Sequence, residues 1–212
     1  MPATAPAVDN DRLPGGVCPG PTDWSASLGV VAGYCTLILT GAPLTARGAD
    51  IASGLVRAGW QVRVVVTPAS VPWVDGDAIT KVTGTAPQRE ARTAGQPKAP
   101  RPDVLVIAPA TFNTINKLAG GIADTFAHST ACEALGAGTP TVVVPMVSGR
   151  LWGHPALANS LRTLQTAGVR FAGLQGVDGA PRAVDSEAAG DIVASFDPAW
   201  IAEAIRQLVK SS

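Results

Sequence analysis

The sequence predicts an α/β fold in which a parallel sheet carries helices on both faces. Short apolar runs alternate with helical patterns along the chain, and each run is apolar on both faces, as in strands buried between two helix layers. The predicted strands cover residues 36–40, 61–66, 104–108, 141–144 and 169–171. Residues 1–34 are rich in Pro, Gly, Ala and Asp, and we expect a largely disordered leader there, followed by a single domain over residues 35–212.

The helices predicted between these strands complete the α/β pattern. A tight turn at Gly41 leads into a helix over about 45–58, which Gly59 ends, so that strand, helix and strand form a right-handed β-α-β unit. The segment 67–102 is rich in proline and predicts a functional flap or mobile segment with one short helix. The other predicted elements are helices at 75–82, 114–119, 124–135, 155–166 and 197–210 and a short strand at 192–195.

Composition excludes several classes of function. The chain of 212 residues has 16 basic and 16 acidic residues and no basic run, which argues against a nucleic-acid partner. No apolar run is long enough for a membrane span, and the N-terminus lacks a signal-peptide pattern, so we expect no membrane partner and a cytoplasmic protein. Three widely spaced cysteines and two histidines predict inert thiols and no metal site.

The polar clusters of the chain follow the ends of the predicted strands. They occupy residues 40–45, 67–70, 109–114 and 145–152. Ligands of parallel α/β sheets bind outside the carboxyl ends of the strands, so these four segments predict one binding site.

This edge predicts a mononucleotide site. Gly41 lets the backbone approach a phosphate, the following helix offers free N–H groups, and the hydroxyls of Thr67 and Ser70 can donate to the same group, although a plain turn and strand cap explain the pattern as well. Neither a G-x-G-x-x-G nor a P-loop motif is present. Thr111, Asn113 and Thr114 are three short polar side chains suited to hold a ligand by hydrogen bonds rather than by charge.

The two histidines differ in their setting. His128 falls inside a predicted helix, and we interpret it as structural. His154 borders the loop at 150–152, where a structural role and a site role both stay open.

Two motifs resemble those of a known family. Residues 109–119, with Gly121, Ile122 and Asp124, resemble the PASANT-type motif of the homo-oligomeric flavin-containing cysteine decarboxylases. That family includes the lantibiotic peptidyl-cysteine decarboxylases, which the string 113–117 matches best, and phosphopantothenoylcysteine decarboxylase. Residues 145–152 align with the family's P-x-M-N-x-x-M-W motif, and the resemblance covers about 36–172.

The resemblance implies a Rossmann-like, flavodoxin-type domain that binds FMN between the subunits of a homo-oligomer, a trimer or a dodecamer built of trimers. It implies oxidation of a C-terminal cysteine of a peptide by FMN, followed by loss of CO₂ to give an enethiol. The implied cofactor-binding residues are Gly41, Ala42, Pro43, Thr67, Pro68, Ala69, Ser70, Pro109, Ala110, Thr111, Phe112, Asn113, Thr114, Met146 and Trp152.

The sequence departs from the family where the chemistry is done. The family's catalytic histidine precedes the third strand, but residues 92–102 contain none, and Ser148 stands in place of the motif's asparagine. The catalytic residues that we predict are therefore Ser148, as a donor near the thiol, Arg150, as a carboxylate clamp or else an interface residue, and His154. Two alternatives stay open: a non-catalytic FMN-binding regulatory or assembly subunit, and another FMN enzyme such as a prenylated-flavin synthase.

Overall fold

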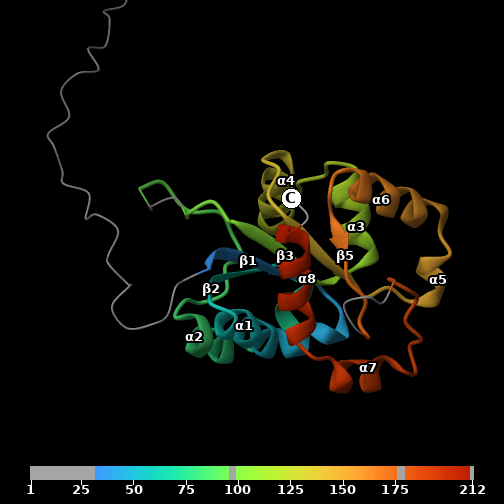
Figure 1. The fold of residues 1–212 in the computed structure, drawn as a ribbon, viewed down its shortest axis with the longest axis horizontal. Helices are drawn as coiled ribbons and strands as arrows, with labels where there is room; N and C mark the ends of the chain where they lie inside the picture. Colours follow the sequence, from blue (N-terminus) through green and yellow to red (C-terminus); the bar gives the residue numbers. More distant parts are fainter. Residues whose placement is uncertain (1–31, 96–98, 176–179, 211–212) are drawn as a thin grey trace, which may run out of the picture. The chain divides into compact units, whose positions relative to one another are not determined.

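A five-stranded parallel sheet forms the centre of the fold (Figure 1). The structure is a computed structural model and describes residues 32–95, 99–175 and 180–210. The strand order is β2-β1-β3-β4-β5, the order of flavodoxin-like sheets, which confirms the predicted fold class. The strands are β1 (Gly33–Leu39), β2 (Trp60–Val66), β3 (Val104–Ala110), β4 (Thr141–Pro145) and β5 (Arg170–Phe171).

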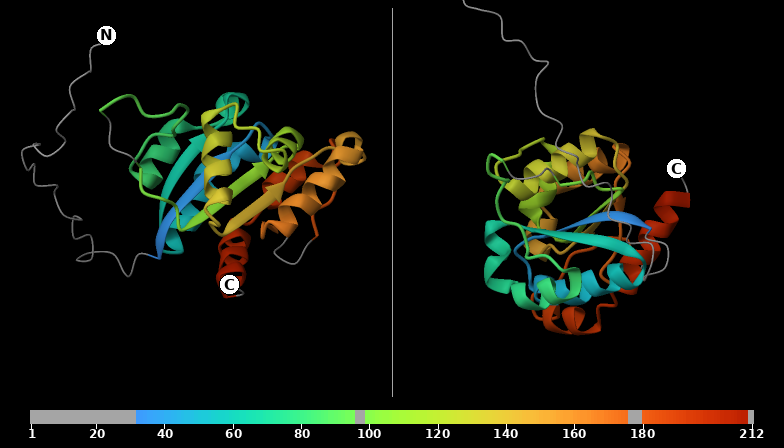
Figure 2. Two further views of the ribbon diagram at one scale, coloured as in Figure 1. Left: turned by 90° about the horizontal axis from the view of Figure 1, so that it is seen from above. Right: turned by 90° about the vertical axis from the view of Figure 1, so that its left-hand side faces the viewer.

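Helices cover both faces of this sheet (Figure 2). One layer consists of α1, α2 and α8, and the other of α3, α4 and α6. The α-helices are α1 (Gly48–Arg57), α2 (Gly76–Thr83), α3 (Phe112–Ala119), α4 (Phe126–Gly136), α5 (Gly149–Trp152), α6 (Pro155–Thr166), α7 (Ala189–Ser195) and α8 (Ala199–Lys210), and the 3₁₀ helices are η2 (Pro43–Arg47) and η3 (Pro68–Trp73). Among the described helices, none combines the length and the apolar character needed to cross a membrane.

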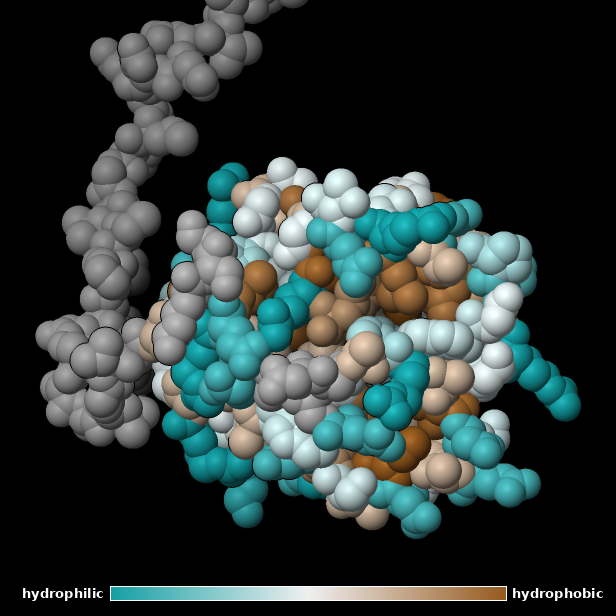
Figure 3. Space-filling view, turned by 45° about the vertical axis from the view of Figure 1, so that its right-hand side comes forward, coloured by the Kyte–Doolittle hydropathy of each residue, from teal (hydrophilic) through white to brown (hydrophobic). Residues whose placement is uncertain are grey.

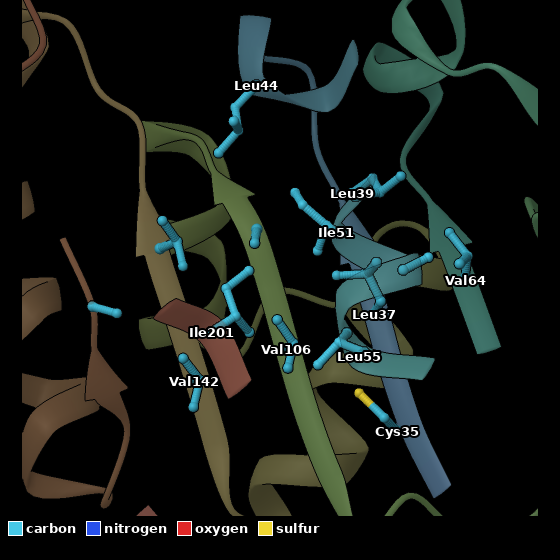
Figure 4. Packing of buried hydrophobic residues seen from close by; sticks show 14 of the residues in the cluster. Cys35, Leu37, Leu39, Leu44, Ile51, Leu55, Val64, Val106, Val142 and Ile201 are labelled. Atoms are coloured by element: carbon cyan, nitrogen blue, oxygen red, sulfur yellow. The ribbon is translucent and has the colours of Figure 1, made fainter. Parts of the chain in front are cut away.

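Alternate side chains of β1 enter opposite layers of the core. Leu37 and Leu39 pack with Ile51 and Leu55 of α1 (Figure 4), whereas Ile38 belongs to the cluster beneath α3, α4 and α6. Each of these side chains is at most 1% exposed. Burial of one such side chain stabilises the fold by about 1.5–3 kcal/mol, so both layers hold the sheet firmly.

The first strand begins earlier than predicted. Residues 1–31 of the predicted leader lie outside the described residues, but Gly33 and Tyr34 already belong to β1. Gly33 pairs with Trp60, and the Tyr34 backbone N–H donates to Asp103 Oδ2 over 2.7 Å. The sheet therefore starts three residues before residue 36, where the first strand was predicted to begin.

Two helical segments differ from the prediction, and a third agrees with it. The strand predicted at 192–195 is wrong, because these residues form part of α7; an apolar run of only three residues, 192–194, does not distinguish strand from helix. The helix predicted at 45–58 starts as η2 and continues as α1. The helix predicted at 75–82 is confirmed as α2, and η3 adds a second ordered turn within the predicted flap.

Candidate functional site

A cavity of about 610 Å³ opens at the carboxyl ends of the strands. This volume lies within the range of small-molecule sites. All four predicted segments contribute to it, at the point where the strand order reverses between β1 and β3. The lining residues are Gly41, Ala42, Pro43, Thr67, Pro68, Ala69, Thr111, Phe112, Asn113, Thr114, Lys117, Thr125, His128, Met146, Val147, Ser148, Leu151, Val184, Ser186 and Ala189.

The loop after β1 packs tightly against the loop after β2. A Cβ atom at Gly41 would lie 2.7 Å from the carbonyl oxygen of Ala69 and 2.9 Å from its Cβ atom. Only glycine therefore lets the two loops meet at this wall of the cavity.

A buried threonine ties the end of β1 to the end of β3. The Thr40 hydroxyl donates to the Pro109 carbonyl oxygen over 2.8 Å and accepts from the backbone N–H of Thr111 over 3.1 Å. Thr40 is 1% exposed, so these bonds are protected from water. They fix the start of α3 relative to β1.

The predicted binding loop at 111–114 is the cap and first turn of α3. Thr111 is the N-cap, and its Oγ1 accepts from the backbone N–H of Thr114 over 3.3 Å. Asn113 is exposed, and its side-chain amide bonds no group within the described part of the chain. Thr111, Phe112 and Asn113 thus line the cavity from a capped helix start.

Four predicted cofactor residues do not line the cavity. Ser70 is fully buried, and its hydroxyl donates to the Thr67 carbonyl oxygen over 2.7 Å, so it cannot donate to a phosphate in this geometry. Pro109 and Ala110 lie behind the wall in β3, where the Ala110 carbonyl accepts from the Met146 N–H over 2.9 Å. Trp152 packs on the core cluster below α6.

The three predicted catalytic residues are not brought together. Ser148 lines the cavity, and its hydroxyl caps no backbone N–H of α5. Arg150 is exposed and lies outside the lining. His154 is the N-cap of α6: its Nδ1 accepts from the Ala156 N–H over 3.1 Å, and its ring meets the ring of Phe112 edge-on at 5.5 Å.

The histidine that lines the cavity is His128, which sequence reasoning interpreted as structural. Its Nδ1 lies 3.0 Å from Asp124 Oδ1 and its Nε2 3.5 Å from Thr114 Oγ1. The i, i+4 spacing of Asp124 and His128 was the signal available in the sequence. Val184, Ser186 and Ala189 also line the cavity, and the residues around them show no pattern that predicts it.

Lys117, Asp124 and His128 form a short network of charged groups on the α3–α4 side of the cavity. The Lys117 ammonium donates to Asp124 Oδ2 over 2.7 Å, and this bond is the main cause that lowers the pKa of Asp124. Burial, and then repulsion from Lys117, lower the pKa of His128, while Asp124 opposes this shift. The imidazole is therefore neutral near pH 7.

The two described cysteines, Cys35 and Cys132, do not line the cavity, and Cys18 lies outside the described residues. Cys35 is buried in β1 and Cys132 half-buried in α4, both as free thiols, and burial raises both pKa values. Among the described residues, no group of three or more His, Cys, Asp or Glu side chains could hold a metal ion.

The cavity fits a flavin. Its lining includes the glycine turn at Gly41 and Thr67, whose hydroxyl lies 3.5 Å from the Leu39 carbonyl oxygen, and Thr111 and Asn113 offer hydrogen-bonding groups to a ligand. Its remaining lining is mostly apolar, and the residues of this part are Phe112, Met146, Val147, Leu151, Val184 and Ala189. Such a surface suits a flat ring system.

Known proteins with similar sequences and folds agree with this fit. The coenzyme A biosynthesis bifunctional protein CoaBC of Thermococcus kodakarensis is 29% identical over 130 residues, which are 57% of this chain and 31% of that protein. The chain thus spans about a third of the length of this curated relative. The crystal structure of SpaF, an FMN-dependent cysteine decarboxylase, is 25% identical with a TM-score of 0.61, over 85% of this chain and 99% of SpaF.

A further solved structure shows the shared fold. The FMN-binding protein AtHal3 superposes with a TM-score of 0.63 and 20% identity, over 85% of this chain and 98% of AtHal3. The Flavoprotein family model matches residues 33–195, which confirms the resemblance and the predicted flavin cofactor. With this match across most of its length, the chain belongs to the Flavoprotein family.

Proposed function

We propose that this chain is an FMN-dependent decarboxylase that oxidatively decarboxylates a C-terminal cysteine of a peptide to an enethiol. The observation that carries the proposal is the α3 start, where Thr111, Phe112 and Asn113 face a cavity that also meets the β1 and β2 loops. This is the motif by which the chain resembles the cysteine decarboxylases, and SpaF bears that activity in its name.

The cavity residues divide between the parts of FMN. The turn at Gly41–Pro43 and Thr67 would hold the phosphate, and Asn113 would bond the ribityl chain or ring. Phe112 and Met146 would contact the apolar part of the ring. When bound, FMN supplies a two-electron acceptor for the Cβ–SH unit of the substrate, whose oxidation to a thioaldehyde permits loss of CO₂.

Ser148 is the residue that would meet the substrate. Its backbone pairs with Val184, which fixes its position at the end of β4, and its side chain lines the cavity. The hydroxyl can donate to a thiolate and so favour loss of the thiol proton. Arg150 lies outside the lining, so we leave its role as a carboxylate clamp out of the proposal.

Mass spectrometry tests the reaction. The flavin-loaded protein is mixed with peptides that end in cysteine and with matched peptides that end in serine or in a cysteine amide. We expect loss of CO₂ and two hydrogens from the cysteine acid only. Phosphopantothenoylcysteine serves as a second substrate, because the chain resembles that branch too. If every cysteine acid remains intact although flavin is bound, the decarboxylase proposal is wrong.

A non-catalytic flavin-binding subunit is the second candidate. It is favoured by the absence of histidine from residues 92–102 together with Ser148 in the place of asparagine. Flavin uptake without turnover of any cysteine substrate is the result that supports it.

We also propose that the chain assembles into the trimer or dodecamer that the resemblance implies. Ile122 and Leu151 are exposed by 49% and 45%, and the face that includes α5 and α6 carries hydrophobic patches between hydrophilic side chains (Figure 3). Exposed apolar patches mark association surfaces. Light scattering measures the mass, and a monomer at micromolar concentration would contradict assembly.

A further inference from the structure

A chain of hydrogen bonds runs along the α3–α4 wall of the cavity. Asp124 Oδ1 lies 3.0 Å from His128 Nδ1, and His128 Nε2 lies 3.5 Å from Thr114 Oγ1. Thr114 Oγ1 lies 3.1 Å from Thr111 Oγ1. His128 and Thr114 are 5% and 3% exposed, so the inner part of this chain is shielded from water. Thr111, Thr114 and His128 all line the cavity.

The direction of the inner bonds follows from what each group can do. Asp124 accepts a bond from Lys117 and is ionised, so it can only accept from His128. The Thr125 hydroxyl, 2.8 Å from Nδ1, is a second acceptor there. The neutral imidazole therefore carries its proton on Nδ1, and Nε2 presents a lone pair to Thr114.

The hydroxyl protons are then all directed inward. Thr114 donates its proton to Nε2 of His128, and Thr111 donates its proton to Thr114. Each hydroxyl oxygen keeps one free lone pair, because Thr111 already accepts from the Thr114 N–H. At Thr111 and Thr114 the wall consequently offers acceptors, and no donor, to a ligand.

Protonation of His128 reverses this chain. With a proton on Nε2, the imidazolium donates to Thr114, whose own proton turns to Thr111. The Thr111 oxygen then accepts two bonds, and its proton points into the cavity. One acceptor facing the ligand has become a donor.

We propose that His128 is a positioning residue for the flavin: when neutral it holds Thr111 as an acceptor for an O–H or N–H of the cofactor, and when protonated it abolishes that bond. This inference rests on the proposed flavin site. The ribityl hydroxyls and the imide N–H are the donors that such an acceptor would take.

Few charges act on this imidazole. Asp124 at the start of its own helix attracts the protonated form, and Lys117 of α3 repels it. Glu133 is the other charged residue of α4, and it interacts with Arg63 of β2. Burial and Lys117 lower the pKa of His128. The hydrogen-bond chain should therefore reverse at a pH below about 6.5, the usual pKa of histidine.

Flavin affinity as a function of pH tests the proposal. Fluorescence quenching is followed from about pH 7.5 to about pH 5, because the usual pKa of histidine lies between them. Riboflavin accompanies FMN, because the FMN phosphate titrates near pH 6. In the native protein we expect affinity for both flavins to fall roughly three- to tenfold toward acid, the value of one hydrogen bond.

Two variants separate this effect from general acid damage. His128→Gln keeps an amide oxygen for Thr114 at every pH, so its riboflavin affinity should stay flat. Thr114→Val keeps a titrating His128 but breaks the chain, and should also be flat. The chain has two histidines, so the NMR titration of His128 is assigned by comparison with His154→Gln.

Each result then decides a distinct question. Riboflavin affinity that stays constant, or that rises, while the His128 resonance titrates overturns the positioning role and leaves the flavin site intact. The positioning role is also overturned if riboflavin affinity falls equally toward acid pH in the native protein, His128→Gln and Thr114→Val. Failure to take up any flavin at any pH overturns the proposed function itself, and this inference with it.

Discussion

The contact between the β1 and β2 loops makes Gly41→Ala a demanding test of the cavity wall. The new methyl carbon would lie 2.7 Å from the Ala69 carbonyl oxygen, and ordinary contact begins at 3.4 Å. The obstacle is backbone, so it cannot rotate away, and the two loops must separate by several tenths of an ångström. Overpacking of this kind costs about 1–3 kcal/mol of unfolding free energy. Because Ala42 and Thr67 move with these loops, flavin affinity should fall by about tenfold, or 1.4 kcal/mol.

Gly136→Ala is the matched control for the same chemical change. No atom lies within 4 Å of a Cβ atom built at Gly136, which ends α4 without a positive φ angle. Alanine there should leave flavin affinity unchanged and raise stability by up to about 1 kcal/mol. Urea unfolding and flavin fluorescence measure both quantities. If Gly41→Ala matches the native protein in both, the tight contact at this wall is refuted.

Four further outcomes are expected. Asn113→Ala should weaken flavin binding roughly three- to tenfold with unchanged stability, because its amide bonds nothing within the described chain; full flavin retention in a dialysis assay would count against our placement of the flavin. Asn116→Ala, on the same helix, should instead cost about 1–3 kcal/mol in urea unfolding, because its side chain links α3 to α6. Leu55→Ala should cost about 2–5 kcal/mol by the same measurement, since Leu55 is fully buried, and a smaller loss would mean that the core collapses around the cavity left behind. The lowered pKa of His128 means that the unfolded chain binds its proton first as pH falls, so stability should decline below about pH 6.5, and less so in His128→Gln; equal declines would contradict the shift.

The sequence predicted the place of the cavity because strand ends are a property of the chain order. Runs such as 104–108 are apolar on both faces, which identifies buried parallel strands, and the segments that follow such strands must share one edge. The helix at 155–166 was predicted with the bounds of α6, since Pro155 marks its first turn and Gly168 follows its end. Local signals therefore sufficed for the edge and for most elements.

Side-chain direction was beyond those signals. Ser70 shares the β2 end with Thr67, but the turn of η3 directs its hydroxyl back to the Thr67 carbonyl. His128 was judged by its position in a helix, whereas its role depends on how α4 packs beside α3 and so faces Thr114. Arg150 and Leu151 are neighbours in α5, and only Leu151 lines the cavity. Such outcomes depend on the rotation of short helices, which no local pattern determines.

The proposed function places cofactor binding and proton transfer on different elements. His128 Nε2 lies 3.5 Å from Thr114 Oγ1 on the wall where we place the flavin, and its Nδ1 lies 3.0 Å from Asp124 Oδ1. Ser148 lies at the end of β4 instead, with a hydroxyl that caps no helix N–H. Residues 92–102, where the family has its catalytic histidine, contain none. A general base must reach the proton that it takes, and His128 lies on a different element, so it does not take the place of that histidine. A change at His128 should therefore act on flavin affinity, whereas a change at Ser148 should act on turnover, and the opposite assignment would mean that the substrate lies against α4.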